Sequence, residues 1–232
     1  MTGATGGIGG AIATALANDV AAVCLVGRNE SKLAALPQLM RTNSSVVEAW
    51  PADLTDDLQI QRLSSQAATR LGRLDILVHC AGTIAHGKLE ESSVETLDGQ
   101  YAANVRGPYS LTRELLPLLK RPRGQIVFIN SSAGLRAPIN AGQFSATQHA
   151  LKALADAFRE ELNAESVRVL SVFPGRTATP RVEAMHRREE RRYEPELLLQ
   201  PSDVASVVLN ALALPWTAEV TNISIRPMLK SY

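Results

Sequence analysis

The sequence contains little that would mark it for a membrane, for nucleic acid or for an oxidising compartment. Its net charge is only +1 over 232 residues, and no apolar run approaches the ~20 residues of a membrane-spanning helix. We recognise no signal peptide. Cys24 and Cys80, the two cysteines, lie in apolar segments without the spacing of a metal pair or a disulfide. We therefore expect a cytoplasmic protein with reduced, buried thiols, no metal, and no nucleic-acid or membrane partner.

The apolar residues occur in short continuous runs that alternate with longer amphipathic stretches. We predict strands at residues 20–26, 46–50, 74–79, 126–131, 167–173 and 220–225. Helices are expected between them, with Thr55 and Ser202 as caps of two helices and a kink at Gly107-Pro108 in a helix over 94–120. Continuous apolar strands that alternate with helices are typical of a parallel sheet covered on both faces. We predict one α/β domain over 1–232, with a doubly wound sheet.

A glycine-rich segment, residues 3–9, stands directly before an alanine-rich stretch that we predict to be a helix to about Asn18. Its glycines allow a tight turn and a close approach of the backbone to a pyrophosphate, which the helix N-terminus then faces. A flexible N-terminal arm is the alternative interpretation. The segment indicates a dinucleotide site whose first ligands are Thr2, Gly3, Gly7, Ile8 and Gly9.

A second segment, residues 126–162, combines a strand that ends at Ser131 with a helix that starts near Phe144. In this region the chain resembles the short-chain dehydrogenase/reductase family, which has a Ser at a strand end, a Tyr thirteen residues later and a Lys four residues after the Tyr. Here Phe144 stands at the Tyr position and Gln148 at the Lys position. The resemblance covers essentially the whole chain and implies a Rossmann-like fold with a nicotinamide cofactor.

The beginning of the chain departs from this family pattern. Family members normally have a complete strand before the glycine loop, whereas only Met1 and Thr2 precede Gly3 here. We expect that the sequence lacks residues of the native chain, and a nearly absent first strand is the alternative. A missing central strand would leave unpaired backbone groups in the middle of the sheet.

The resemblance implies further cofactor ligands along the chain. Asp53 would bind the adenine, or else act as a displaced helix cap. Arg28, after Gly27 at the end of the second strand, would pair with a 2′-phosphate, so we expect NADP(H) rather than NAD(H), unless Arg28 is only a surface residue. The remaining ligands that the resemblance implies are Ala81, Gly82, Gln148 for the ribose, Pro174, Gly175 and Thr177, with Thr179 as an alternative to Thr177.

The catalytic positions are altered in their chemistry. In the family the Tyr transfers a proton and the Lys lowers its pKa, but Phe144 has no hydroxyl and Gln148 no charge. Ser131 would still orient the substrate oxygen, and Asn104 would be a remnant of a proton relay. Alternative acids in the sequence are His149, Tyr109 and Tyr193, whereas His79 is expected to be structural.

These changes leave several functions open. We favour an NADP(H)-dependent oxidoreductase of a small carbonyl or alcohol with weakened or non-standard catalysis. The alternatives are a nucleotide-binding pseudoenzyme, acting as a sensor or as an inactive subunit of a mixed oligomer, and an enzyme with a new acid in the pocket. The charged segment 176–200 is expected to be a substrate lid, or otherwise a solvated helix. The family's habit implies a homodimer or homotetramer through helices at 94–120 and 144–162.

Overall fold

The computed structural model describes residues 1–40 and 46–229 and contains two groups of parallel strands. The first is the pair β1 (Ala22–Gly27) and β2 (Val46–Pro51). The second has the order β3 (Ile76–His79), β4 (Gln125–Ile129), β5 (Arg168–Pro174) and β6 (Asn222–Ile225). All pairings are parallel, and every strand of the second group is reached by a helical crossover. The predicted parallel α/β architecture is confirmed.

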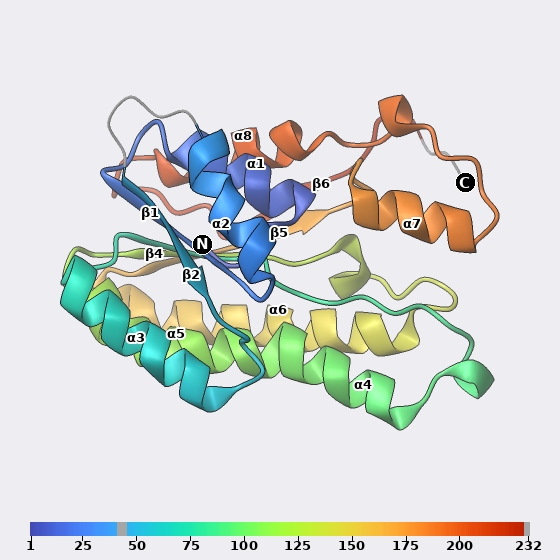
Figure 1. Cartoon of the computed structure of the whole chain (residues 1–232), viewed down its shortest axis with the longest axis horizontal. Coiled ribbons are helices and arrows are strands. Elements are labelled where there is room, and N and C mark those ends of the chain that lie inside the picture. Colours follow the sequence, from blue (N-terminus) through green and yellow to red (C-terminus); the bar gives the residue numbers. More distant parts are fainter. Residues whose placement is uncertain (41–45, 230–232) are drawn as a thin grey trace.

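Residues 1–3 lie between the two groups and connect them through hydrogen bonds (Figure 1). Val26 donates its N–H to the Met1 carbonyl at 2.8 Å, and Gly3 donates back to the Val26 carbonyl at 2.9 Å. On the other side, the Thr2 N–H donates to the Val78 carbonyl at 2.9 Å. This short segment therefore occupies the place of a central strand between β1 and β3, and the six strands form one doubly wound arrangement.

Helices cover both faces of the sheet (Figure 1). One face carries α1 (Gly7–Leu16), α2 (Glu30–Leu39) and α8 (Pro201–Leu212). The other carries α3 (Asp57–Leu71), α4 (Val94–Tyr101), α5 (Gly107–Lys120) and α6 (Gly142–Leu162). The alternation of side chains along β4 separates the two cores: Ile126 and Phe128 pack toward α5 and α6, whereas Val127 packs toward α1 and α8.

The predicted helix over 94–120 is interrupted slightly before the expected kink. A π-helical turn, Ala102–Arg106, separates α4 from α5, and Gly107-Pro108 begins α5. Gly107 packs closely on the loop between β2 and α3, because a Cβ added to it would lie 2.7 Å from the Leu54 carbonyl oxygen. The wide turn places Asn104 on the inner side of the helix, where it is buried.

Two predicted caps are wrong by one or two residues. Asp56, not Thr55, caps α3 by accepting the N–H groups of Leu58 and Gln59, because the Thr55 hydroxyl is bonded to Asp53. At α8 the cap is Gln200 rather than Ser202. Pro201 occupies the first helical turn, and the side chain of Asp203 accepts the Gln200 N–H at 2.8 Å.

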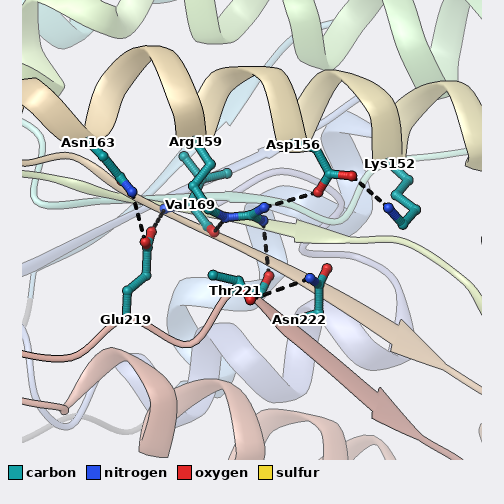
Figure 2. Close-up of polar contacts among 8 residues, drawn as sticks. All are labelled: Lys152, Asp156, Arg159, Asn163, Val169, Glu219, Thr221 and Asn222. Atoms are coloured by element: carbon teal, nitrogen blue, oxygen red, sulfur yellow. Dashed lines mark hydrogen bonds and ion pairs between the residues drawn. The ribbon is translucent and has the colours of Figure 1, made fainter.

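The C-terminal half of α6 is attached to the sheet through a buried arginine (Figure 2). Arg159, whose exposure is 7%, donates from Nε to the Val169 carbonyl at 3.0 Å and from Nη2 to the Thr221 carbonyl at 3.1 Å. Its Nη1 donates to Asp156 at 3.0 Å, and Asp156 also accepts from Lys152 at 2.6 Å. The guanidinium therefore fixes α6 against β5 and the segment that leads into β6.

A second bridge runs beside the first (Figure 2). Glu219 accepts the backbone N–H of Val169 at 2.8 Å through one carboxylate oxygen and the Asn163 amide at 3.0 Å through the other. These bonds connect the end of α6, the start of β5 and the loop before β6. The relative position of these three elements is thus set by polar contacts as well as by apolar packing.

Candidate cofactor and catalytic site

A cleft of about 460 Å³ opens at the carboxyl ends of the strands. It is lined by the glycine loop, by the ends of β1 to β5, by the first turns of α6 and by the segment after β5. The strand order changes direction at residues 1–3, and ligands of open α/β sheets bind at such a switch point. The cleft therefore lies where the fold favours a bound dinucleotide.

The glycine loop forms one wall of this cleft. Gly3 has a φ of +67°, and a Cβ on it would lie 2.6 Å from the Cys80-Ala81 backbone. A Cβ on Gly9 would lie 2.2 Å from the Gly3 carbonyl oxygen. No side chain caps the N-terminus of α1 and no acid lies in its first turn, so its first N–H groups face the cleft without a partner on the helix. This end of the helix fits a phosphate.

Of the predicted ligands in this region, Thr2 alone lies outside the cleft lining. Gly3, Gly7, Ile8 and Gly9 line the cleft. Thr2 is buried beneath them, where its hydroxyl accepts the N–H groups of Cys80 and Ala81, both at 3.1 Å. Its position is that of a support for the loop at residues 80–82, because its oxygen is already used by these two donors.

Arg28, after β1, and Asp53, after β2, also line the cleft. Arg28 is exposed and forms no ion pair within residues 1–40 and 46–229. One oxygen of Asp53 accepts the N–H and hydroxyl of Thr55, at 2.9 and 2.8 Å, and its other oxygen is not used by these bonds. Because Gly27 stands where an acid would repel a phosphate, the local charge suits a phosphorylated ribose.

The loop after β3 is held by Asn104. Its side-chain oxygen accepts the Thr83 N–H at 2.7 Å, and its amide donates to the Thr83 carbonyl at 2.8 Å and to the Thr147 hydroxyl at 3.0 Å. Gly82 is confined by the same group, because a Cβ there would lie 2.9 Å from the Asn104 oxygen. Asn104 thus connects the π-helical turn, the cleft loop Ala81-Gly82 and α6.

Ser131, Phe144 and Gln148 line the cleft together, as their spacing predicts. The Ser131 hydroxyl accepts the Ala133 N–H at 3.1 Å. The backbone carbonyl of Gln148 accepts the Asn130 amide at 3.0 Å. The side-chain amide of Gln148 has no bonding partner in the described part of the chain. The strand end and the helix thus hold the three positions in place, but none of the three side chains is an acid or a base.

The residue beside the Phe144 ring is His86, with 6.0 Å between the ring centroids and an angle of 57° between the ring planes. His86 follows the cleft loop, and its Nδ1 lies 3.7 Å from Glu189. Sequence reasoning missed this residue because nothing near it in the chain signals a site. Only the folding of the loop after β3 against the start of α6 brings the two rings together.

The acids considered from sequence lie elsewhere. His149 is exposed on α6, with Nδ1 bonded to the Ser145 carbonyl at 2.9 Å. Tyr109 packs on Phe158, and Tyr193 packs edge-on against a histidine of α7 (Pro180–Arg188). None of the three lines the cleft.

His79 is buried below the cleft. It is 2% exposed, stacks on Phe128 and contacts the Thr112 hydroxyl through Nε2 at 2.8 Å. Burial lowers the pKa of His79 to about 3, so its imidazole is neutral at physiological pH. These contacts agree with a structural role.

The segment after β5 forms another wall of the cleft. Pro174, Gly175, Thr177 and Thr179 all line it. The Thr177 hydroxyl is turned to the Gly175 carbonyl at 3.1 Å, whereas Thr179 caps α7 and packs directly against Gly7. The next residue but one, Arg181, lines the cleft as well and donates to the Gly82 carbonyl at 2.9 Å. The start of α7 therefore lies across the opening between the glycine loop and Gly82.

The segment 176–200 contains α7 and a short helix, Pro195–Leu197, and it is attached to the cleft loop by charge. Glu189, directly after α7, lies 3.6 Å from Arg176, 3.2 Å from Arg191 and 3.7 Å from His86. Burial raises the pKa of Glu189, but the bond from Arg191 and the charges of both arginines and His86 outweigh it and lower the pKa. A charged Glu189 therefore joins the segment to the loop that carries His86.

The two cysteines are free and half-buried, less deeply than expected. Burial raises the pKa of Cys24 to about 11 and that of Cys80 to about 12, so both are thiols at neutral pH. Cys80 lines the cleft beside Gly3. Residues 1–40 and 46–229 contain no group of acidic, histidine or cysteine side chains that could hold a metal. In the same residues no helix is long and apolar enough to span a membrane.

Comparison with known proteins gives consistent matches over the whole chain. Residues 1–190 match the model of the short chain dehydrogenase family. An uncharacterized oxidoreductase from Staphylococcus epidermidis is 31% identical over 98% of this chain and 96% of its own. An alcohol dehydrogenase from the archaeon Thermococcus sibiricus, complexed with 5-hydroxy-NADP, has a TM-score of 0.88 at 28% identity and covers 100% of this chain and 97% of its own. A variant of the actinorhodin polyketide ketoreductase with NADPH has a TM-score of 0.89 at 25% identity and covers 100% and 96%.

Proposed function

We propose that this chain, which belongs to the short-chain dehydrogenase family, is an NADP(H)-dependent oxidoreductase that interconverts a small carbonyl compound and its alcohol with weakened or non-standard catalysis. The observation that carries the proposal is that one cleft contains the uncapped end of α1, the exposed Arg28 and the three positions Ser131, Phe144 and Gln148. Phosphate-binding and reaction positions are thus joined in one cavity. Two of the similar solved structures are complexes with NADP or NADPH, which supports the choice of cofactor.

The cofactor would lie with its pyrophosphate on the glycine loop. Gly3 would let the backbone approach the phosphates closely, and Gly7, Ile8 and Gly9 would offer the N–H groups of the first turn of α1. Arg28 would pair with the 2′-phosphate and Asp53 would contact the adenine. Toward the nicotinamide, the ligands would be Ala81, Gly82, the Gln148 amide, Pro174, Gly175 and a threonine after β5. Thr177 is the first choice and Thr179 the alternative, since each hydroxyl already has one bond, to the Gly175 carbonyl and from the Val182 N–H respectively.

The chain's own residues would orient the reactants at the other end of the cleft. The cofactor, when bound, supplies or accepts a hydride. Ser131 would hold the substrate oxygen, and the free amide of Gln148 would bond a ribose hydroxyl. Phe144 has the aromatic ring of the family's tyrosine but no hydroxyl, so it would not transfer a proton. Asn104 would act through position alone, because its side chain is bonded to Thr83 and Thr147.

Several features outside the cleft belong to the same proposal. The chain would act as one domain over 1–232, with residues 176–200 as a lid over a small substrate, in the cytoplasm. Apolar side chains are exposed on the outer helices, among them Val94 at 67%, Tyr101 at 50% and Tyr109 at 42%. Such surfaces are typical of subunit contacts, which supports a homodimer or homotetramer.

A pseudoenzyme is the second candidate, and the same two positions favour it. A cleft that holds Phe144 and Gln148 can bind NADP(H) without transferring a proton through either residue. The chain would then act as a sensor of the cofactor or as an inactive subunit beside an active one.

One assay separates the two functions. The purified protein is mixed with NADPH and a panel of ketones and aldehydes, and oxidation of NADPH is followed by its absorbance. The oxidoreductase predicts slow, protein-dependent oxidation with at least one carbonyl compound. Bound NADPH that is oxidised with no member of the panel would favour the pseudoenzyme.

A further inference from the structure

The structure places one titratable ring beside the position where the family's proton donor is missing. His86 contacts Phe144 with 6.0 Å between ring centroids, and its side chain is 27% exposed. None of the four histidines is itself a lining residue of the cleft, but the His86 ring packs on the lining residue Phe144. The rings of His79, His149 and His186 have other partners: Phe128, the Ser145 carbonyl and Arg176. An acid that serves a substrate held at Ser131 and Phe144 must stand near this ring.

The backbone on either side of His86 is held in place. The N–H of Ala85 donates to the side-chain oxygen of Gln100 at 3.0 Å, and the N–H of Gly87 donates to the carbonyl of Asn140 at 2.8 Å. Asn140 lies directly before α6, so this bond fixes the loop against the helix that carries Phe144. The ring is therefore positioned by its neighbours rather than by chance contact.

Glu189 completes a pair with His86. Its carboxylate lies 3.7 Å from Nδ1, which leaves Nε2 as the nitrogen that no protein group in the described chain uses. A carboxylate on one ring nitrogen orients an imidazole and stabilises its protonated form, while the other nitrogen exchanges the proton. Arg176 and Arg191 contact the same carboxylate, and Arg176 also acts on the charge of His86.

We propose that His86 is a catalytic acid and base of this protein, in place of the missing tyrosine, and that Glu189 is its positioning residue. The inference rests on the oxidoreductase function proposed above. In carbonyl reduction the carbon gains the hydride of the reduced cofactor, the C=O π pair moves to oxygen, and the oxygen takes the proton from Nε2. Water then reprotonates the imidazole, and alcohol oxidation is the reverse.

The pH dependence gives the sign of the effect. Burial lowers the pKa of His86 below its ordinary value, although Glu189 acts in the opposite direction. Reduction needs protonated His86, so its rate falls as pH rises through this pKa. Oxidation needs neutral His86 and rises over the same range. Residues 176–200, the proposed lid, would also take part in this pair. Glu189 belongs to that segment, directly after α7, and it lies beside His86 only while the segment contacts the cleft loop.

The test compares His86→Gln in two backgrounds, the natural protein and the variant Phe144→Tyr/Gln148→Lys, in which a tyrosine supplies the proton. We expect a loss of about 100-fold or more in kcat for the natural protein, which is what a positioned acid contributes, and no comparable loss in the tyrosine background. His149→Gln is the matched control, because this histidine is exposed on α6 with its Nδ1 bonded to the Ser145 carbonyl, and it should change neither background.

Each other outcome is decisive. An equal loss in both backgrounds would make His86 a structural residue, and no loss in either would remove it from the reaction; both overturn the inference. Activity in the tyrosine background but not in the natural protein would overturn the catalytic role of His86. The proposed fold and cofactor site would not be affected by that result. Inactivity of both, with NADPH bound, would contradict the oxidoreductase function itself.

A second measurement does not depend on turnover. The pKa of His86 is followed by NMR in the natural protein and in Glu189→Gln, with thermal unfolding as a check on folding. Removal of the carboxylate should lower this pKa further, because the charge that favours the protonated ring is lost. An unchanged pKa would show that the pair does not act in solution and would overturn the role of Glu189.

Discussion

The two ends of α6 differ in whether their side chains are bonded to the rest of the protein. At the N-terminal end, Phe144 has no polar atom and the Gln148 amide points into the cleft without a partner in the described chain. At the C-terminal end, Arg159 is bonded to two backbone carbonyls and to Asp156, and Asn163 is bonded to Glu219 (Figure 2). One end anchors the helix and the other presents it to a ligand. The scaffold of the site is therefore independent of the two altered positions.

This difference has an energetic basis. A buried guanidinium that loses its partners, or carbonyls that lose the guanidinium, cost several kcal/mol, so the anchored end tolerates little change. Gln148 lines a cavity large enough for a ligand. Replacing its side chain takes a hydrogen bond from no other group in the described part of the chain. The chemical group at the cleft can therefore change while the backbone geometry stays the same.

The largest effect is expected from restoring the missing groups. Phe144→Tyr alone should do little, because an unassisted phenol keeps a pKa near ~10. Gln148→Lys adds the charge that lowers it. The double variant should gain in carbonyl reduction, by less than the full ~10²–10⁴-fold of a positioned acid because His86 already supplies a proton, and should exceed the product of the single effects. The gain is measured as kcat/KM with NADPH over all four variants. Additive effects would show that the cleft has changed beyond these positions.

The next effect concerns the anchored end. Arg159→Ala removes the guanidinium bonds to the Val169 and Thr221 carbonyls and to Asp156. Thr221 keeps the Ser171 N–H and Asp156 keeps Lys152, so the free energy of unfolding should fall by about 1–3 kcal/mol. Urea unfolding measures it. Arg113→Ala is the matched control, because Arg113 is 68% exposed and pairs only with Glu114; its loss should be below about 1 kcal/mol. Similar losses for both variants would remove the contrast between the two ends.

A smaller effect is expected at the adenosine end of the cleft. Arg28→Ala should weaken NADPH binding by roughly 10- to 100-fold, the value of one or two charged hydrogen bonds, and leave NADH nearly unchanged. Arg73→Ala, at an exposed arginine paired with Asp75, is the control. Calorimetry gives both affinities. Equal weakening of NADPH and NADH would contradict the assignment of Arg28 to the 2′-phosphate.

The smallest effect is in thiol reactivity. Because burial raises the pKa of both thiols, a bulky maleimide should label Cys24 and Cys80 slowly at neutral pH. Only Cys80 lines the cleft, so NADPH should slow its labelling and leave Cys24 unaffected. Mass spectrometry of the labelled peptides distinguishes the two. Rapid labelling of either thiol would contradict the burial described here.

The sequence predicted what depends on local pattern and on chain order. Alternating apolar runs and helices predicted the parallel sheet, and the carboxyl ends of its strands bring Ser131, Phe144 and Gln148 to one cleft with Gly3 and Arg28. The caps at Asp56 and Gln200 were missed because neighbouring oxygens compete for the same N–H groups. Such competition is decided by geometry and not by residue type.

Contacts between segments that are distant in the chain could not be predicted from the sequence. His86 is far from Phe144 in the chain, and no motif joins them; a bond from Gly87 to Asn140 does. Thr2 was predicted as a ligand because it adjoins the glycine loop, but the turn at Gly3 buries it under residues 80–82. Both cases depend on how loops close, which periodicity does not encode.

The most direct test of the central claim is a calorimetric titration of the natural protein with NADPH and with NADH. The cleft combines an uncapped helix N-terminus, a glycine loop and an exposed Arg28, with Gly27 rather than an acid before it. We predict one site per chain that binds both nucleotides and binds NADPH more tightly. Absence of binding, or tighter binding of NADH, would contradict the account.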